Sequence, residues 1–215
     1  MPRAFKIIPN LERWEEVLEL TRPEEWTSHA MAQAVNIFAS NFDPVRAERF
    51  YKRWLVPAVR RDLARSKKLN CHLFEALKKG LYKTNAWFKG VMFELCGEDV
   101  LLREVKVIES ILTKMSIPMI SASVAMLKLM EIPATTATIH YLWALLGKHY
   151  TLPKRVLVGM VQYLTGFEGV EGEASVAWQS LLLTLVKQYS QSLDEMSRAA
   201  LSQLAKNKKH HIMTP

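Results

Sequence analysis

Apolar residues recur at intervals of three and four along most of the chain, and strict alternation of apolar and polar residues is scarce. This spacing is typical of amphipathic helices, which bury one face and expose the other. Leu73, Leu77 and Leu81, for example, share one face of a helix that is expected to begin at Asn70. Proline or a capping residue precedes most of these segments, as at Asp43-Pro44, and helices commonly begin in this way. The pattern predicts about eleven helices of about 10 to 20 residues each.

The succession of helices without intervening strands predicts an all-α fold rather than a sheet covered by helices. Short loops between successive helices favour antiparallel helix pairs stacked in a row, which is a HEAT-like α-solenoid. We expect a single helical-repeat domain over residues 1–205 and a basic, disordered tail over residues 206–215. The sequence contains no strict repeat, so a closed globin-like or irregular helical domain is the alternative architecture.

The chain has 215 residues, of which only Cys71 and Cys96 are cysteines. Two cysteines cannot form a disulfide framework, which indicates a reducing compartment. The longest apolar stretch, residues 117–130, contains Lys128 and is shorter than the roughly 20 apolar residues that a membrane-spanning helix needs. We therefore expect no membrane partner.

The formal net charge of +8 is distributed very unevenly along the chain. Residues 46–89 contain thirteen Lys and Arg against three acidic residues, an excess of +10, whereas the rest of the chain has a net charge of −2. Arg46, Arg49, Arg53 and Arg60 are separated by three, four and seven positions, so we expect them to share a helix face. If the helices of this segment are neighbours, their charges merge into one basic patch.

Such a patch suits phosphate groups, because Lys and Arg that neutralise phosphates release counterions and give strong, salt-sensitive binding. Trp87 lies between Lys83 and Lys89 in the sequence, and we expect it to be an exposed aromatic residue of the patch. The predicted nucleic-acid-binding residues are Arg60, Arg61, Lys67, Lys68, Lys78, Lys79, Lys83, Trp87 and Lys89. An acidic protein segment is the competing ligand, and it would need apolar pockets beside the same cations. A solvated helix face that only aids solubility is the third interpretation.

No motif for catalysis or for metal binding stands out in the sequence. Cys71, His72 and Cys96 lack the ligand spacing of a zinc site. A dinucleotide fingerprint, a His-Glu-x-x-His motif and a nucleophile elbow are also missing. The segment from Gly166 to Glu173 contains three glycines, but its three glutamates would repel a phosphate, so we interpret it as an acidic loop between helices. We expect no enzymatic activity, no cofactor, no metal and no small-molecule substrate.

A series of short strings connects the chain with a known family. The longest block runs from Leu69-Asn70 through Ala76-Leu77-Lys78-Lys79 and Ala86-Trp87-Phe88-Lys89-Gly90 to Leu95-Cys96. Other strings lie before and after it: Arg3-Ala4-Phe5-Lys6-Ile7-Ile8-Pro9, Ile37-Phe38-Ala39-Ser40-Asn41, Ser116-Ile117-Pro118, Ala125-Met126-Leu127-Lys128 and Leu182-Leu183-Thr184-Leu185-Val186. In this order they resemble, over nearly the whole chain, the bystin family of eukaryotic small-subunit ribosome assembly factors.

The resemblance implies a non-enzymatic scaffold of helical repeats that acts in ribosome biogenesis, in small ribosomal subunit assembly and pre-rRNA processing. It implies three kinds of partner: pre-ribosomal RNA of the small-subunit head, ribosomal proteins and other assembly factors. It also implies a location in the nucleus and nucleolus, with passage to the cytoplasm on pre-ribosomal particles. Family members usually carry a long charged N-terminal region that this sequence does not include, and Cys71 stands where an aromatic residue is expected. The predicted binding residues rest on the distribution of charge and not on a family motif.

Overall fold

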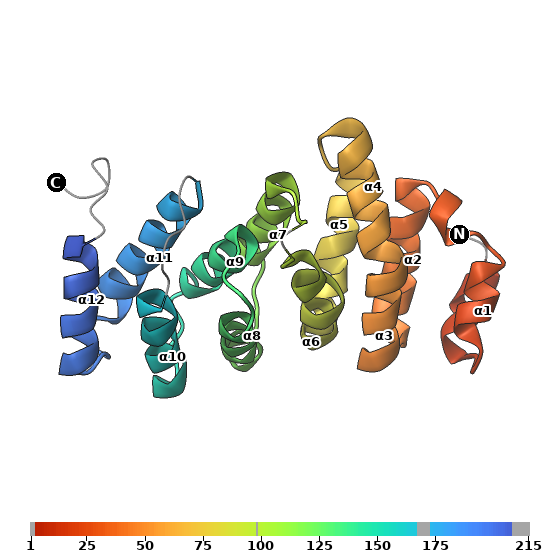
Figure 1. Cartoon of the computed structure of the whole chain (residues 1–215). Coiled ribbons are helices and arrows are strands. Elements are labelled where there is room, and N and C mark those ends of the chain that lie inside the picture. Colours follow the sequence, from red (N-terminus) through yellow and green to blue (C-terminus); the bar gives the residue numbers. More distant parts are fainter. Residues whose placement is uncertain (1–2, 98, 167–172, 208–215) are drawn as a thin grey trace. The chain divides into compact units, whose positions relative to one another are not determined.

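The computed structural model describes residues 3–97, 99–166 and 173–207, and Figure 1 shows it as a ribbon. These residues form helices and turns, with no β-strand among them. The all-α fold expected from the sequence is therefore confirmed for the described part of the chain.

The tertiary contacts divide the chain into two compact units, residues 1–111 and residues 112–215. We refer to them as unit 1 and unit 2 and describe each by itself. The single domain over residues 1–205 and the solenoid arrangement remain predictions, because both depend on how the two units are placed.

Unit 1 consists of short α-helices joined by turns. Its α-helices are α1 (Trp14–Glu19), α2 (Ser28–Asn41), α3 (Pro44–Phe50), α4 (Val56–Ser66), α5 (Cys71–Gly80), α6 (Thr84–Trp87) and the greater part of α7 (Leu102–Lys114). The side chain of Asp43 begins α3 by accepting hydrogen bonds from the amides of Val45 and Arg46, both at 2.9 Å. Asn70 begins α5 in the same way, through the amide of His72 at 2.9 Å. These two caps satisfy amides that have no partner inside the helix.

Helical turns of other kinds connect several of these α-helices. A π-helical turn at Tyr51–Leu55 joins α3 to α4, and Pro57 follows it in the first turn of α4. Proline has no N–H to donate to the helix, which is consistent with an irregular turn at this point. A second π-helical turn, Phe88–Met92, follows α6. The remaining turns are 3-10 helices at Arg3–Lys6, Ile8–Asn10, Pro23–Glu25, Leu81–Lys83 and Phe93–Leu95.

An aromatic cluster forms the centre of unit 1. The ring of Phe38 on α2 lies 4.9 Å, between centroids, from each of Phe42 and Phe50, and all three side chains are buried. Helix α2 also packs along α5. The hydroxyl of Tyr51 donates a buried hydrogen bond of 3.1 Å to the carbonyl oxygen of Gly80, at the end of α5. These contacts fix the position of α5, which carries or adjoins most of the predicted binding residues.

Unit 2 is built from longer helices that pack in pairs. They are α8 (Met119–Glu131), α9 (Thr136–Leu146), α10 (Lys154–Thr165), α11 (Glu173–Tyr189) and α12 (Glu195–Asn207). Helix α9 packs against α11, where the indole N–H of Trp143 donates to the hydroxyl of Thr184 at 3.1 Å. Helix α10 packs against both α8 and α12.

Two segments discussed in the sequence analysis fall partly outside the described residues. Helix α12 continues to Asn207, two residues beyond the expected end of the domain at residue 205. The rest of the basic tail, residues 208–215, and residues 167–172 of the acidic loop lie outside the described part of the chain.

Candidate nucleic-acid interface

All nine predicted binding residues belong to unit 1. Eight of them reach the surface wholly or in part: Arg60, Arg61, Lys67, Lys68, Lys78, Lys79, Lys83 and Lys89. The ninth, Trp87, does not. Eight of the nine residues are therefore accessible to a ligand. Their ion pairs and their positions in unit 1 decide which of them are the stronger candidates for binding.

The prediction that Trp87 is an exposed aromatic residue is wrong, because its side chain is 0% exposed. Trp87, Val91 and Leu95 follow one another at intervals of four, and all three are buried, so Trp87 continues the core-facing stripe of its helix. The ring also packs closely against Gly80, where a Cβ atom would lie 3.1 Å from the indole Cδ1. Trp87 therefore supports the end of α5 from inside and offers no surface to a base.

Acidic residues from outside the basic segment pair with several of its arginines. Arg49 lies 3.6 Å from the carboxylate of Glu15 on α1, and Arg53 lies 3.3 Å from the same carboxylate. Arg53 also pairs with Glu19. The fold thus brings acids from residues 15–19 against the segment, so the excess of +10 counted along the sequence overstates the positive charge of this surface.

Arg60 pairs with an acid that is itself buried. Its Nε atom lies 3.5 Å from Oε1 of Glu104, and its Nη1 atom lies 3.5 Å from Oδ2 of Asp99. The side chain of Glu104 is only 5% exposed. Burying a carboxylate without a compensating cation is costly. Arg60 therefore has a structural partner, which makes it a weaker candidate for phosphate binding than the sequence suggested.

Three lysines of the segment form ion pairs with nearby glutamates. The N–O distances are 2.6 Å for Lys52–Glu94, 2.9 Å for Lys78–Glu75 and 3.7 Å for Lys89–Glu48. Ion pairs at exposed positions contribute little free energy, about 0 to 1 kcal/mol each. Lys78 and Lys89 can therefore exchange a glutamate for a phosphate at small cost.

Five predicted cations and Arg65 form no ion pair within the described residues, and these six cations fall into two groups. The α4-end cluster, at and after the end of α4, consists of Arg61, Arg65, Lys67 and Lys68; Arg65 was counted in the basic segment but not among the predicted binding residues. The α5-end cluster consists of Lys79, Tyr82 and Lys83, with Tyr82 as an added aromatic residue. Arg61 donates a hydrogen bond to the carbonyl oxygen of Glu24, which leaves its charge uncompensated.

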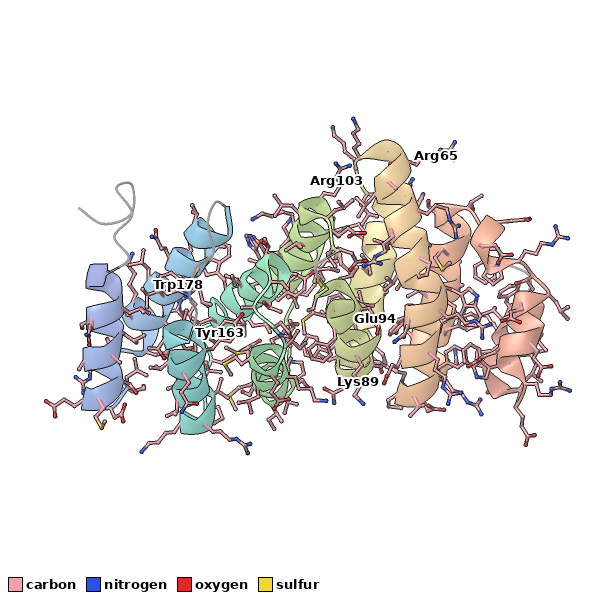
Figure 2. The ribbon with its side chains drawn as sticks, viewed as in Figure 1. Arg65, Lys89, Glu94, Arg103, Tyr163 and Trp178 are labelled. Atoms are coloured by element: carbon pink, nitrogen blue, oxygen red, sulfur yellow. The ribbon has the colours of Figure 1, made fainter. Side chains whose placement is uncertain are left out.

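These two clusters lie at opposite ends of α5. The helix has ten residues, so its ends are about 15 Å apart. Figure 2 labels Arg65 of the α4-end cluster near the upper end of unit 1, and Lys89, which follows the α5-end cluster in the sequence, near its lower end. The chain reverses direction at Lys67, and α5 carries the later lysines away from the earlier ones. A single continuous basic patch stays a prediction.

Tyr82 is the exposed aromatic residue that the sequence analysis missed. Its side chain is 76% exposed, and Nζ of Lys83 lies 5.7 Å from the centroid of its ring. Tyr82 and Lys83 lie three and four positions after Lys79, and residues at these spacings are neighbours on a helix surface. That spacing, together with the buried stripe formed by Leu77 and Leu81, could have identified Tyr82 in place of Trp87.

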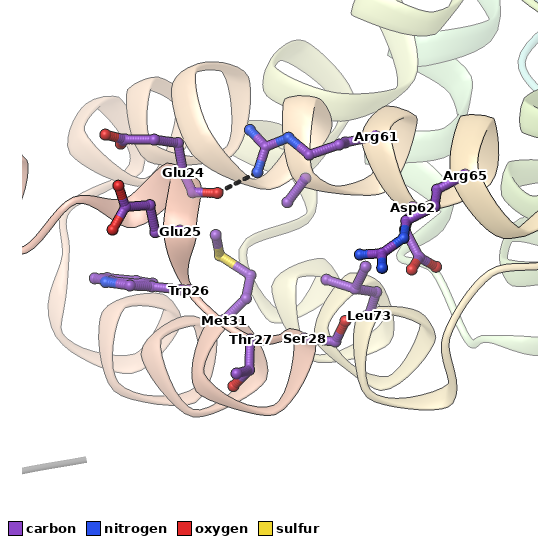
Figure 3. A pocket seen from close by; sticks show the side chains of 11 residues that line it. Glu24, Glu25, Trp26, Thr27, Ser28, Met31, Arg61, Asp62, Arg65 and Leu73 are labelled. Atoms are coloured by element: carbon purple, nitrogen blue, oxygen red, sulfur yellow. Dashed lines mark hydrogen bonds between the residues drawn. The ribbon is translucent and has the colours of Figure 1, made fainter.

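A pocket adjoins the α4-end cluster. It has a volume of about 340 Å³. The 3-10 turn Pro23–Glu25, helix α4 and the first residues of α2 and α5 surround it. Figure 3 shows Arg61 and Arg65 extending over it from α4, with Met31 and Leu73 on its apolar side. Glu24, Glu25 and Asp62 also line the pocket, so its charge is mixed.

The described residues also bear on metal binding, membrane insertion and thiol reactivity. They contain no group of three or more His, Cys, Asp or Glu side chains that could hold a metal ion. No helix in this part of the chain has the length and hydrophobicity needed to cross a membrane. Cys71 is exposed, whereas burial raises the pKa of the Cys96 thiol to about 12 and keeps it protonated near neutral pH.

Comparison with known proteins places this chain in a family. A family model described as Bystin matches residues 1–215. The chain is 45% identical to Bystin of Homo sapiens, in a match that covers 100% of this chain and 49% of the relative. It is 41% identical to Bystin of Monosiga brevicollis, covering 100% of this chain and 52% of the relative. The chain belongs to the bystin family, as the resemblance of its strings indicated, and it spans about half the length of the curated relatives it matches.

Proposed function

We propose that this chain is a ribosome biogenesis factor, a non-enzymatic helical scaffold that binds pre-ribosomal RNA during small ribosomal subunit assembly and pre-rRNA processing. Membership of the bystin family supports this proposal through the role that the resemblance implies. The observation that carries the RNA-binding part is the pair of cationic clusters in unit 1, whose Lys and Arg have no acidic partner among the described residues.

The proposed mode of binding uses each cluster for a different contact. Lys67 and Lys68 lie at an exposed turn and suit phosphates of a structured RNA. Nζ of Lys83 lies 5.7 Å from the centroid of the exposed Tyr82 ring, and Lys79 lies three positions before Tyr82, which suits a phosphate beside an unpaired base. The separation of the clusters by the length of α5 favours an extended RNA surface over a single nucleotide.

In the proposed mechanism the protein acts by occupying its binding site on the RNA. A helical-repeat scaffold that holds an immature RNA conformation would delay docking of ribosomal proteins until it is released. The proposed partners are pre-ribosomal RNA of the small-subunit head, ribosomal proteins and other assembly factors. The proposed location is the nucleus and nucleolus, with passage to the cytoplasm on pre-ribosomal particles.

A second candidate function is that of a protein–protein adaptor, in which the basic surface holds an acidic segment of another assembly factor. The pocket beside Arg61 and Arg65 favours this alternative, because it joins cations to apolar walls at Met31 and Leu73. Its three carboxylates weaken the case for an acidic ligand at this particular place. For that reason RNA is the better supported ligand.

The experiment that separates the two functions measures the affinity of the purified chain for pre-ribosomal head RNA across a series of salt concentrations. A random duplex of equal length serves as the control. We expect a steep salt dependence and a clear preference for the head RNA. A steep dependence without preference would contradict specific recognition, and no binding at low salt would overturn the RNA proposal in favour of the adaptor.

A further inference from the structure

Unit 2 carries a groove between α8 and α10 that is independent of the basic clusters of unit 1. It has a volume of about 620 Å³. Its lining consists of Leu127, Met130, Glu131, Lys154, Arg155, Val158, Gly159, Gln162 and Tyr163. Most of these residues are apolar or small, and the cations stand at the start of α10.

The floor of the groove is apolar because two helices approach each other at a glycine. A Cβ atom on Gly159 would lie 3.2 Å from Cε of Met130 and 3.9 Å from Cδ2 of Leu127. The side chains of Leu127 and Met130 therefore lie directly against the backbone of α10. Tyr163, one helical turn after Gly159, is positioned by its hydroxyl, which lies 3.1 Å from the hydroxyl of Thr138.

Exposed apolar side chains extend this floor along α8. Ile120 is 74% exposed and Val124 is 50% exposed, and with Leu127 they are spaced by four and three positions. Residues at this spacing form one stripe along a helix. Val158 on α10, 45% exposed, lines the groove beside it. Single exposed apolar residues are common, but a contiguous group around a groove is typical of an interaction site.

The charge around the groove is positive. Lys154 and Arg155 are exposed, form no ion pair within the described residues, and line the groove at the first turn of α10. Lys128 is exposed on α8, one turn after Val124. Glu131 is the only acidic side chain in the lining. An occupant that complements this surface carries apolar residues on one face and acidic residues at its edges.

We propose that the groove between α8 and α10 binds an acidic amphipathic segment of a protein partner. The segment places apolar side chains at intervals of three and four against Ile120, Val124 and Val158, and its carboxylates pair with Lys154 and Arg155. This is the arrangement by which amphipathic helices bind hydrophobic grooves. Nucleic acid fits the surface less well, because an exposed apolar stripe offers nothing to phosphates.

The test selects ligands without assuming a partner. The 215-residue protein is presented with a random 16-residue peptide library on phage, and the most enriched peptides are synthesised with a fluorescent label. We expect enriched peptides to combine Asp and Glu with apolar residues at intervals of three and four. Enrichment no greater than in a selection without protein, or enrichment of peptides without this pattern, would overturn the proposal.

Matched variants then locate the binding. Val158→Asp should weaken the fluorescence-anisotropy affinity of the selected peptide by about tenfold or more, as expected for an apolar contact at the centre of an interface. Met196→Asp, at an apolar residue of α12 that is 82% exposed, should leave it within about twofold. The variant Lys79→Glu/Lys83→Glu in unit 1 should also leave it unchanged. Equal losses in Val158→Asp and Met196→Asp, or a loss only in the unit 1 variant, would show that the groove is not the site.

Discussion

The guanidinium of Arg60 lies 3.5 Å from the carboxylate of Glu104, whose side chain is almost completely buried. The amide of Leu101 also donates to this carboxylate, at 2.9 Å, so the acid holds the start of α7 as well. A residue counted among the RNA-binding candidates is thus tied to an internal charge. Ion pairs of this kind separate the cations that stabilise unit 1 from the cations that can bind a ligand.

Loss of Arg60 should therefore destabilise the protein. Arg60→Ala leaves the Glu104 carboxylate buried without its cation, and we expect the free energy of unfolding to fall by about 1 to 3 kcal/mol. Arg65→Ala, which removes an exposed cation without an ion pair in the described residues, should change it by less than about 0.5 kcal/mol. Urea unfolding followed by circular dichroism measures both. Equal effects of the two substitutions would contradict a structural role for Arg60.

Gly90 should not tolerate a larger residue. A Cβ atom at this position would lie 2.6 Å from the backbone oxygen of Glu48 and 3.1 Å from Cβ of Tyr51. Backbone atoms cannot move aside locally, so we expect Gly90→Ala to cost about 1 to 3 kcal/mol of stability. In Gly147→Ala the nearest atom is at an ordinary distance of 3.4 Å, and the change should be below about 0.5 kcal/mol. Thermal unfolding of the two variants and of the original chain measures both effects. Equal stability of Gly90→Ala and Gly147→Ala would contradict the close approach of Gly90 to the backbone of Glu48.

The two cysteines should react at very different rates. Cys71 is exposed, whereas burial raises the pKa of Cys96 to about 12, so Cys96 has almost no thiolate at pH 8. Because the thiolate is the reactive form, a disulfide reagent should titrate one thiol quickly and the second only on unfolding. The raised pKa also predicts that the stabilising contribution of the neutral thiol declines as pH rises from 9.0 toward 12. Rapid reaction of both thiols in the folded protein would contradict this assignment.

Tyr82 should contribute to the binding of unpaired RNA. Stacking of a base on an aromatic ring contributes about 1 to 3 kcal/mol, so Tyr82→Ala should weaken binding of a single-stranded oligonucleotide by about five- to a hundredfold. Tyr82→Phe keeps the ring and should bind within about twofold of the original chain. Duplex RNA, whose bases are already stacked, should show little difference. Equal behaviour of the Ala and Phe variants would remove Tyr82 from the proposed interface.

The helical fold could be predicted from the sequence because its signals are local. The caps at Asp43 and Asn70 and the stripe at Leu73, Leu77 and Leu81 all appear in the structure at the expected positions. Such features depend on residues within one or two helical turns. The positions of whole units depend on many weak contacts between distant segments, and the arrangement of helix pairs in a row remains a prediction.

The site could be predicted only in part, because charge pairing is not local. Glu15 lies more than thirty residues before Arg49 in the sequence but pairs with it in space, and a count over one segment does not contain this contact. Trp87 and Tyr82 illustrate a second limit. Flanking lysines suggested exposure for Trp87, but its spacing from Val91 and Leu95 placed it in the core. For these two residues, helical spacing predicted burial correctly, whereas the charge of neighbouring residues did not.

A charge reversal at the α5-end cluster tests directly whether unit 1 binds RNA through this surface. The variant Lys79→Glu/Lys83→Glu is compared with Lys187→Glu, an exposed lysine of α11 in unit 2, for binding of pre-ribosomal head RNA across a salt series. We expect the double variant to raise the Kd by about tenfold or more and to lower the salt slope by about two. The control should bind as the original chain does, and both should retain the helical circular dichroism spectrum. Unchanged affinity of the double variant, with its fold intact, would contradict RNA binding through this surface.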